Sequence, residues 1–305
     1  MRREASVALA QTMISAALWG TSFPVISVAI RGGLSPVFFV FVRFAIAAPL
    51  MLVVAASARS GVKALMRAKG VWILGFLNAV GFLCQFVGQK YTAASVAALL
   101  VNLSVVLAAA GGAVFLGERL GTLGVAGVLL AFAGTGLIAT GGNLASLSGG
   151  QLFGDGLYMV SAVVWAGYIV YAKKKTDEQN WDPMALASCI VAATAVFLVP
   201  AAAVSWVPAK VSVGSWEAIG YTVVFNTAIP FVLYQAGLRH LTASLSAVAL
   251  MLEIVVAVLI SVAFIGGETF DIFSGAGAVA VVASILMVSR SEVRGKSLSV
   301  GGRSA

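Results

Sequence analysis

Charge is the scarcest property of this chain. Only 10% of its 305 residues are Asp, Glu, Lys or Arg, whereas 61% are hydrophobic. In soluble globular domains about a quarter of the residues are charged. The chain therefore has too little polar surface to cover a water-soluble globule, which excludes a cytosolic enzyme and a disordered scaffold. A lipid bilayer supplies the apolar solvent that this composition requires.

Cysteine and histidine are also rare. Cys84 and Cys189 lie in apolar runs far apart in the sequence, a spacing that supports neither a disulfide framework nor a metal site, and His240 is the single histidine. The chain has no zincin-type His pair, no Gly-x-Ser-x-Gly, no P-loop and no paired aspartates within a helix. The sequence therefore predicts no cofactor, and it supports neither an intramembrane hydrolase nor an ATP-driven pump.

Long hydrophobic runs are what the chain has instead. A helix needs about 20 apolar residues to cross a bilayer, and the alternating polarity of a membrane β-barrel is absent. The sequence therefore predicts an all-α integral membrane protein with ten transmembrane helices, near residues 7–30, 36–57, 70–88, 93–116, 121–140, 155–172, 184–205, 216–237, 242–265 and 272–289.

The basic residues predict the orientation. With the N-terminus inside, 15 of the 19 Lys and Arg lie at inner helix ends, and only Arg31, Lys90 and Lys210 lie in outer loops. Because Lys and Arg favour the cytoplasmic side, both termini are expected in the cytoplasm. The charges are spread over many helix ends rather than along one face, so we expect them to meet lipid headgroups and not nucleic acid.

An internal repeat appears at an offset of 150 residues, where Thr92-Ala93 matches Thr242-Ala243 and Gly117-Glu118 matches Gly267-Glu268. It predicts a first repeat of five helices over 1–147, a second over 148–290 and a cytoplasmic tail over 291–305. Because five is odd, the second repeat is expected to be inverted, an architecture typical of transporters.

The Gly-Glu pairs and the neighbouring glycines of the repeat also have predicted roles. Glu118 and Glu268 are expected to cap the helix that follows each of them. Close helix packing is expected at Gly117, Gly121, Gly124, Gly127, Gly275 and Gly277.

Two ionisable residues lie at membrane depth, where charge is costly and therefore a functional candidate. Glu253 lies near the centre of the ninth run, and Arg43 lies about two turns into the second. Glu253 is a candidate for binding a proton or a substrate ammonium group, and Arg43 for binding a carboxylate or forming a gate. The alternative is a structural pair that holds two helices together.

Polar and aromatic residues share faces on several runs. Kinks are expected at the Gly20–Pro24 segment and at Asn226–Pro230, because proline removes a backbone donor. In lipid these polar groups need protein or water partners, and a partly polar, aromatic-lined central cavity accounts for them. The candidate lining residues are Trp19, Ser22, Phe23, Asn78, Phe82, Gln85, Asn102, Trp165, Tyr168 and Tyr234, together with Glu253.

In their order along the chain, several short motifs resemble those of the drug/metabolite transporter superfamily, in its bacterial ten-helix EamA-type branch. They include Leu18-Trp19-Gly20, Phe41-Val42-Arg43-Phe44, Leu116-Gly117-Glu118-Arg119 and Gly267-Glu268-Thr269. The chain departs from the family where Ser104 and Ile254 replace prolines that are common in the fourth and ninth spans.

The resemblance implies a basket of helices around a cavity lined by spans one, three, four, six, eight and nine. It also implies the movement of metabolites, commonly amino-acid efflux, and the aromatic candidates look like those of aromatic amino-acid exporters. We therefore expect a bacterial inner-membrane exporter of aromatic and other apolar amino acids that works by alternating access. In it, Asn78, Gln85, Asn102 and Glu253 would meet the charged groups of the amino acid.

Two alternatives remain from the sequence. An exporter of cationic drugs, nucleosides or other small metabolites would also use aromatic walls and a carboxylate. A membrane scaffold that transports nothing would need neither. The sequence leaves the oligomeric state and the coupling ion open.

Overall fold

The computed structural model describes residues 2–58, 61–92, 94–147, 152–205, 211–265 and 271–301, and the side chains of these except 2, 23, 24, 94, 95, 146, 264, 265 and 293–301. Within these residues the chain is helical. The helices are α1 (Arg2–Gly20), α2 (Ser22–Arg31), α3 (Pro36–Ser57), α4 (Val62–Leu65), α5 (Lys69–Gly88), α6 (Ala94–Leu116), α7 (Thr122–Thr140), α8 (Leu152–Gln179), α9 (Pro183–Ser205), α10 (Val213–Val223), α11 (Ile229–Leu238), α12 (Ala243–Leu250), α13 (Leu252–Ile260) and α14 (Ile272–Gly301). Short 3-10 and π segments lie at Leu144–Leu147, Val224–Ala228 and Ser261–Ile265.

Ten stretches of helix in the described part of the chain are long and apolar enough to cross a bilayer, as the sequence predicted. The first combines α1 and α2, the eighth combines α10 and α11, and the ninth combines α12 and α13. The chain is therefore a multi-pass membrane protein.

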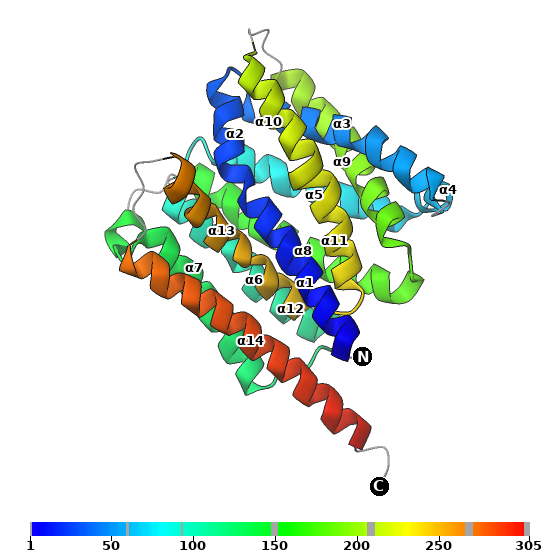
Figure 1. Ribbon diagram of the computed structural model, residues 1–305, viewed down its shortest axis with the longest axis vertical. Helices are drawn as coiled ribbons and strands as arrows, with labels where there is room; N and C mark the ends of the chain where they lie inside the picture. Colours follow the sequence, from blue (N-terminus) through cyan, green and yellow to red (C-terminus); the bar gives the residue numbers. More distant parts are fainter. Residues whose placement is uncertain are drawn as a thin grey trace.

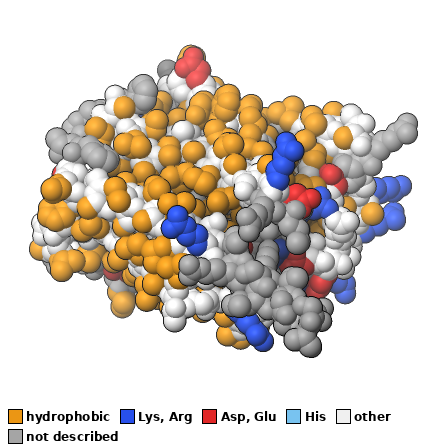
Figure 2. All heavy atoms as spheres, turned by 60° about the horizontal axis from the view of Figure 1, so that its bottom comes forward, with side chains coloured by type: hydrophobic (Ala, Val, Ile, Leu, Met, Phe, Trp, Pro, Cys, Tyr) orange, Lys and Arg blue, Asp and Glu red, His pale blue; other side chains and the backbone are white. Residues whose placement is uncertain are grey.

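The helices form one bundle (Figure 1). α7 packs against α14 along one edge, and α3 packs against α9 along the other. Between these edges α1 packs against α11, and α8 packs against both α5 and α6. The chain begins and ends at the same end of the bundle, here called the N-terminal end (Figure 1). Hydrophobic side chains cover much of the face in Figure 2, and charged ones gather toward one side of it.

Three of the spans are interrupted near their middle. The first breaks at Thr21, whose hydroxyl donates to the Leu18 carbonyl oxygen at 2.7 Å. The eighth contains the π segment Val224–Ala228, directly before Pro230. Thr21 lies within the first segment expected to kink and the π segment overlaps the second, because a proline has no N–H to continue the helical hydrogen bonds. The ninth span breaks at Met251 although it lacks the family's proline.

Glycines allow the closest helix crossings. A Cβ on Gly277 of α14 would lie 2.5 Å from the Gly134 carbonyl oxygen, and one on Gly127 would lie 2.8 Å from Val288. The packing role expected for Gly127 and Gly277 thus agrees with the structure. The same expectation is wrong for Gly117, which has no neighbour within 4 Å of a Cβ position and a φ of +67°. This left-handed backbone, which favours glycine, turns the chain at the end of α6.

Gly20 lies where α1 crosses α13, and we expect that no larger residue fits there. A Cβ at this position would lie 2.5 Å from the Glu253 carbonyl oxygen and 2.9 Å from Val256 Cβ. Gly20→Val should therefore force the two helices apart and cost roughly 1–3 kcal/mol. The measurement is thermal unfolding in detergent. The matched control is Gly167→Val, where a Cβ meets nothing within 4 Å. Equal unfolding temperatures for the two variants would contradict this crossing.

Candidate functional site

Aromatic side chains from five helices contact one another inside the bundle. Centroid distances are 5.5 Å for Trp19–Phe231, 5.9 Å for Phe231–Phe44 and 5.3 Å for Phe44–Phe82. The series continues at 5.2 Å for Phe82–Trp165 and 5.8 Å for Trp165–Tyr168, and Trp19 also lies 5.8 Å from Tyr234. These spacings and the mostly edge-to-face angles are those that aromatic pairs prefer. The seven residues, called here the aromatic cluster, join α1, α3, α5, α8 and α11.

Five residues of the aromatic cluster were candidates from the sequence: Trp19, Phe82, Trp165, Tyr168 and Tyr234. The structure brings them together. Phe44 and Phe231 were not predicted, because a phenylalanine in an apolar run has the same sequence pattern whether it faces lipid or protein. The available signals were the position of Phe44 directly after Arg43 and of Phe231 directly after Pro230.

Arg43 lies against the aromatic cluster and is only 2% exposed. Its guanidinium carbon lies 5.0 Å from the ring centroid of Phe44 and 5.1 Å from that of Phe82, which is cation–π geometry. Within the described part of the chain, Arg43 Nε and Nη2 are buried without a hydrogen-bond partner. A guanidinium with unused donors in an apolar interior can donate hydrogen bonds to an anionic group.

Glu253 provides the opposite charge. It lies on α13 and interacts electrostatically with Arg43 of α3, so the two charges face a common interior region. Unlike Arg43, Glu253 is only partly buried. A cation beside the aromatic cluster and an anion that interacts with it thus come from two different helices.

A second polar group lies at the Tyr168 side of the aromatic cluster. Gln235 Nε2 donates to the Tyr168 hydroxyl at 3.0 Å, and both residues are buried. Among the described residues, Gln235 Oε1 and the Tyr234 hydroxyl have no hydrogen-bond partner. Gln235 was not among the predicted site residues, although its match with Gln85 in the repeat was a signal. These atoms are available for a polar ligand.

The broken first and eighth spans are tied together beside Trp19. Trp19 Nε1 donates to the Asn226 carbonyl oxygen at 2.9 Å. The Asn226 side-chain amide donates to the Leu18 carbonyl oxygen and, at 3.1 Å, to Thr21 Oγ1. Each break frees backbone groups, and these bonds satisfy them within the protein, as lipid requires. They also hold the Trp19 indole in position.

The remaining predicted residues lie on α2, α5 and α6. Asn78 donates to Thr194 Oγ1 at 2.9 Å and so joins α5 to α9, and Asn102 donates at 2.6 Å to the Ala98 carbonyl oxygen of its own helix. Ser22 is buried on α2, and Gln85 is partly buried on α5. The side chain of Phe23 lies outside the described residues. None of these four described residues has a recorded contact with the aromatic cluster.

Accessibility differs between the two ends of the bundle. In the ninth span, every residue of α12 from Ala243 to Ala249 is buried, whereas Val255 is the one buried residue of α13. The fourth span shows no such difference: Val96 and Ala97 are buried in its first half, and Val114 and Phe115 are exposed in its second. In the ninth span, the half nearer the N-terminal end is therefore the more buried.

A surface hollow of about 330 Å³ lies at the N-terminal end, where α1, α9 and α11 meet, and Arg3, Arg239 and His240 are among the residues that line it. It is separate from the aromatic cluster, because none of the seven aromatic residues lines it.

Comparison with known proteins identifies the family. The EamA-like transporter family matches residues 6–140 and 152–290. "Uncharacterized transporter YyaM" of Bacillus subtilis (strain 168) is 28% identical over 258 residues, which cover 81% of this chain and 82% of that protein. An "Uncharacterized transporter" of Archaeoglobus fulgidus is 28% identical over 299 residues, covering 94% and 98%. One solved structure, titled only "Crystal structure of protein", shares the fold with a TM-score of 0.78 at 19% identity, covering 92% of this chain and 96% of that one.

Proposed function

The chain belongs to the EamA-like transporter family, and from this premise we propose that it exports amino acids across the bacterial inner membrane, with a preference for aromatic and other apolar side chains. The observation that carries the proposal is the pair of opposite charges, Arg43 and Glu253, beside the aromatic cluster. An amino acid has the complementary groups: a carboxylate, an ammonium group and a side chain.

Each part of the substrate has a partner in this proposal. The carboxylate accepts hydrogen bonds from Arg43 Nε and Nη2, which are otherwise unused among the described residues. The ammonium group pairs with the partly exposed carboxylate of Glu253. The side chain packs against rings such as Trp165 and Phe82, where an aromatic contact contributes about 0.5–1.5 kcal/mol beyond burial.

Transport follows from the two five-helix repeats. We propose that they are inverted, that both chain termini face the cytoplasm, and that the repeats rock about the aromatic cluster so that it opens to one side at a time. The paired packing supports this view, because α1 contacts α11 much as α8 contacts α5. The first repeat supplies Arg43 and the second supplies Glu253, so movement of one repeat against the other changes the site itself.

Uptake of labelled phenylalanine into inside-out vesicles tests the proposal. Trp165→Ala is expected to lower uptake about tenfold through lost aromatic packing, and Glu253→Gln is expected to lower it further through loss of the ammonium partner. Trp216→Ala is the matched control, since Trp216 is 52% exposed on α10. Background uptake of phenylalanine, threonine and methionine alike by the wild-type protein would rule out this substrate class.

Export of cationic drugs or nucleosides is the second candidate, favoured by the combination of Glu253 with aromatic walls. A cationic substrate has no group that pairs with the Arg43 guanidinium. This candidate therefore predicts that such compounds compete with phenylalanine and that Arg43→Gln still transports them. A scaffold that binds no solute would instead show no thermal stabilisation by any of these compounds.

A further inference from the structure

The segment after α6 folds back toward its own helix. Gly117 takes the left-handed conformation, and the Glu118 N–H then donates to the Gly112 carbonyl oxygen at 3.1 Å. Gly112 leaves room for this return, because a Cβ there would lie 2.5 Å from Glu118 Oε2. Two glycines thus direct the Glu118 carboxylate into the bundle rather than toward the next helix.

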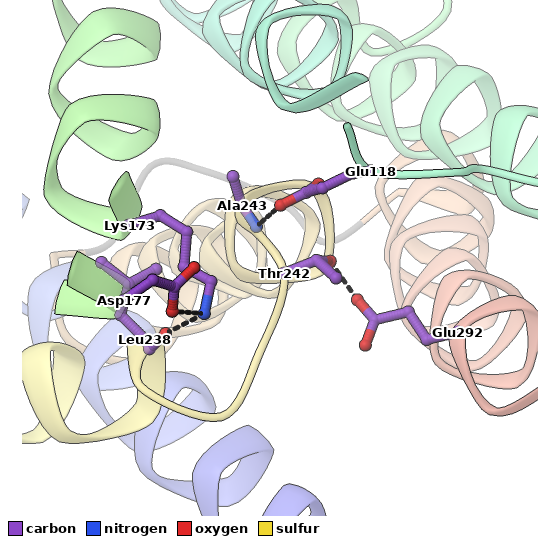
Figure 3. Close-up of polar contacts among 7 residues, drawn as sticks. All are labelled: Glu118, Lys173, Asp177, Leu238, Thr242, Ala243 and Glu292. Carbon is purple, nitrogen blue, oxygen red and sulfur yellow. Dashed lines mark hydrogen bonds and ion pairs between the residues drawn. The ribbon is translucent and has the colours of Figure 1, made fainter. Parts of the chain in front are cut away.

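The carboxylate caps α12, which belongs to the other half of the chain. Glu118 Oε1 accepts a hydrogen bond from the Ala243 N–H at 2.5 Å (Figure 3). Glu118 Oε2 accepts from the Ser244 N–H at 3.1 Å and from Ser244 Oγ at 2.6 Å. The first N–H groups of a helix have no partner within it, and the helix dipole favours an anion at this position. The cap that the sequence predicted for the helix after Glu118 is therefore corrected: Glu118 caps a helix of the second repeat. Glu268 lies outside the described residues.

Further contacts hold the same end of α12. Thr242 Oγ1 donates to Glu292 of α14 (Figure 3). It also accepts from the Leu245 N–H at 3.1 Å. Beside it, Lys173 Nζ bonds Asp177 at 2.7 Å and the Leu238 carbonyl oxygen at 3.2 Å, which ties α8 to the end of α11. Of these side chains only Glu118 comes from the first repeat.

This capped end is also the closed end. α12 is buried along its length, and Ser246, one turn beyond the cap, is fully buried. α6 packs directly against α12 here. The bonds of Glu118 join the end of α6 to the start of α12, so any movement that separates these two helices must break them.

We propose that Glu118 is the gate residue of the N-terminal end. Its three hydrogen bonds, called here the latch, hold the first repeat to the start of the ninth span. When these bonds break, the site opens to the N-terminal end. The inference rests on the proposed transport function, since a gate is needed only where solute passes. Glu118 is a positioning residue, because it acts on the site through the span that carries Glu253.

Cysteine labelling tests the latch without any substrate. Ser246→Cys is introduced into a Cys84→Ala/Cys189→Ala background, and labelling by a membrane-impermeant maleimide is timed in inside-out and right-side-out vesicles. Glu118→Gln should raise the labelling rate on the order of tenfold, in inside-out vesicles only, because the neutral amide cannot bind both N–H groups as an anion does. Ser244→Ala removes one of the three bonds and should give a smaller rise. Glu178→Gln, which loses an exposed pair with Lys175, is the matched control.

A second reporter separates gating from local loosening. Ala98 lies on the same face of α6 as Asn102, toward the opposite end of the bundle. In an alternating mechanism, labelling of Ala98→Cys from the opposite side should fall when Glu118→Gln opens the N-terminal end. Unchanged labelling of Ser246→Cys in both Glu118→Gln and Ser244→Ala, or a rise at both reporters, would overturn the proposal. The labelling experiment uses no solute, so its result does not depend on whether the protein takes up amino acids.

Discussion

Arg43→Gln is expected to lower phenylalanine transport at least about 100-fold, which corresponds to the loss of a charge-assisted pair worth roughly 3 kcal/mol. The guanidinium is buried between Phe44 and Phe82 and faces Glu253, so its removal also leaves a carboxylate without its counter-charge. We therefore expect Arg43→Gln also to unfold at a lower temperature than the wild-type protein. The measurements are uptake into vesicles and thermal unfolding of the purified variant.

A double-mutant cycle separates folding from substrate binding. Arg43→Gln/Glu253→Gln carries no unpaired charge, so we expect it to unfold at a higher temperature than Arg43→Gln alone while its transport stays lost. Arg43→Lys keeps the charge but not the planar fork, and we expect it to recover only part of the flux. Arg31→Gln, at the exposed end of α2, is the control. Near wild-type uptake by Arg43→Gln would exclude Arg43 from the substrate site.

Asn226→Leu is expected to lower the free energy of unfolding by roughly 1–3 kcal/mol, through the loss of two buried hydrogen bonds. The asparagine is fully buried, and its amide donates to the Leu18 carbonyl oxygen and to Thr21 Oγ1 at the break of the first span. Leucine is branched at the same carbon but makes neither bond. The Leu18 carbonyl oxygen keeps its bond from Thr21, and Thr21 Oγ1 keeps its bond from Tyr221, so the substitution removes two buried hydrogen bonds of about 0.5–1.5 kcal/mol each and leaves no acceptor unpaired. In lipid no bulk water replaces the lost bonds. Thermal unfolding in detergent measures the effect.

The same substitution should also weaken transport, because Trp19 is held by the Asn226 carbonyl oxygen and packs against Phe231. Asn143→Leu, in a loop where the side chain caps only Ala145, serves as the control for stability. If Asn226→Leu unfolds at the temperature of the wild-type protein, the two breaks do not depend on each other as the structure indicates.

The fold could be predicted because it depends on local properties of the sequence. The length and apolarity of each run predict a span, since a helix must satisfy its own backbone groups in lipid. Arg43 and Glu253 were recognisable singly, because an ionisable residue in such a run is rare whatever surrounds it. The breaks near Pro24 and Pro230 were recognisable because proline acts on its own helix.

The sequence could not predict which residues of different helices contact one another. Asn78, Phe82 and Gln85 share a helical spacing, yet Asn78 bonds Thr194 whereas Phe82 contacts Trp165. Helical spacing predicts which residues share one broad face of a helix. The rotation of the helix within the bundle decides which neighbouring helix each of these residues contacts.

By itself, then, the sequence determined ten apolar spans, the two charges within them and an internal repeat, all of which follow from composition and order along one chain. Only the tertiary structure decided that Phe44 and Phe231 complete the aromatic cluster, that Gln235 meets Tyr168, and that Glu118 caps α12 rather than its own neighbour. These are contacts between residues far apart in sequence, and the packing of whole helices against one another selects them.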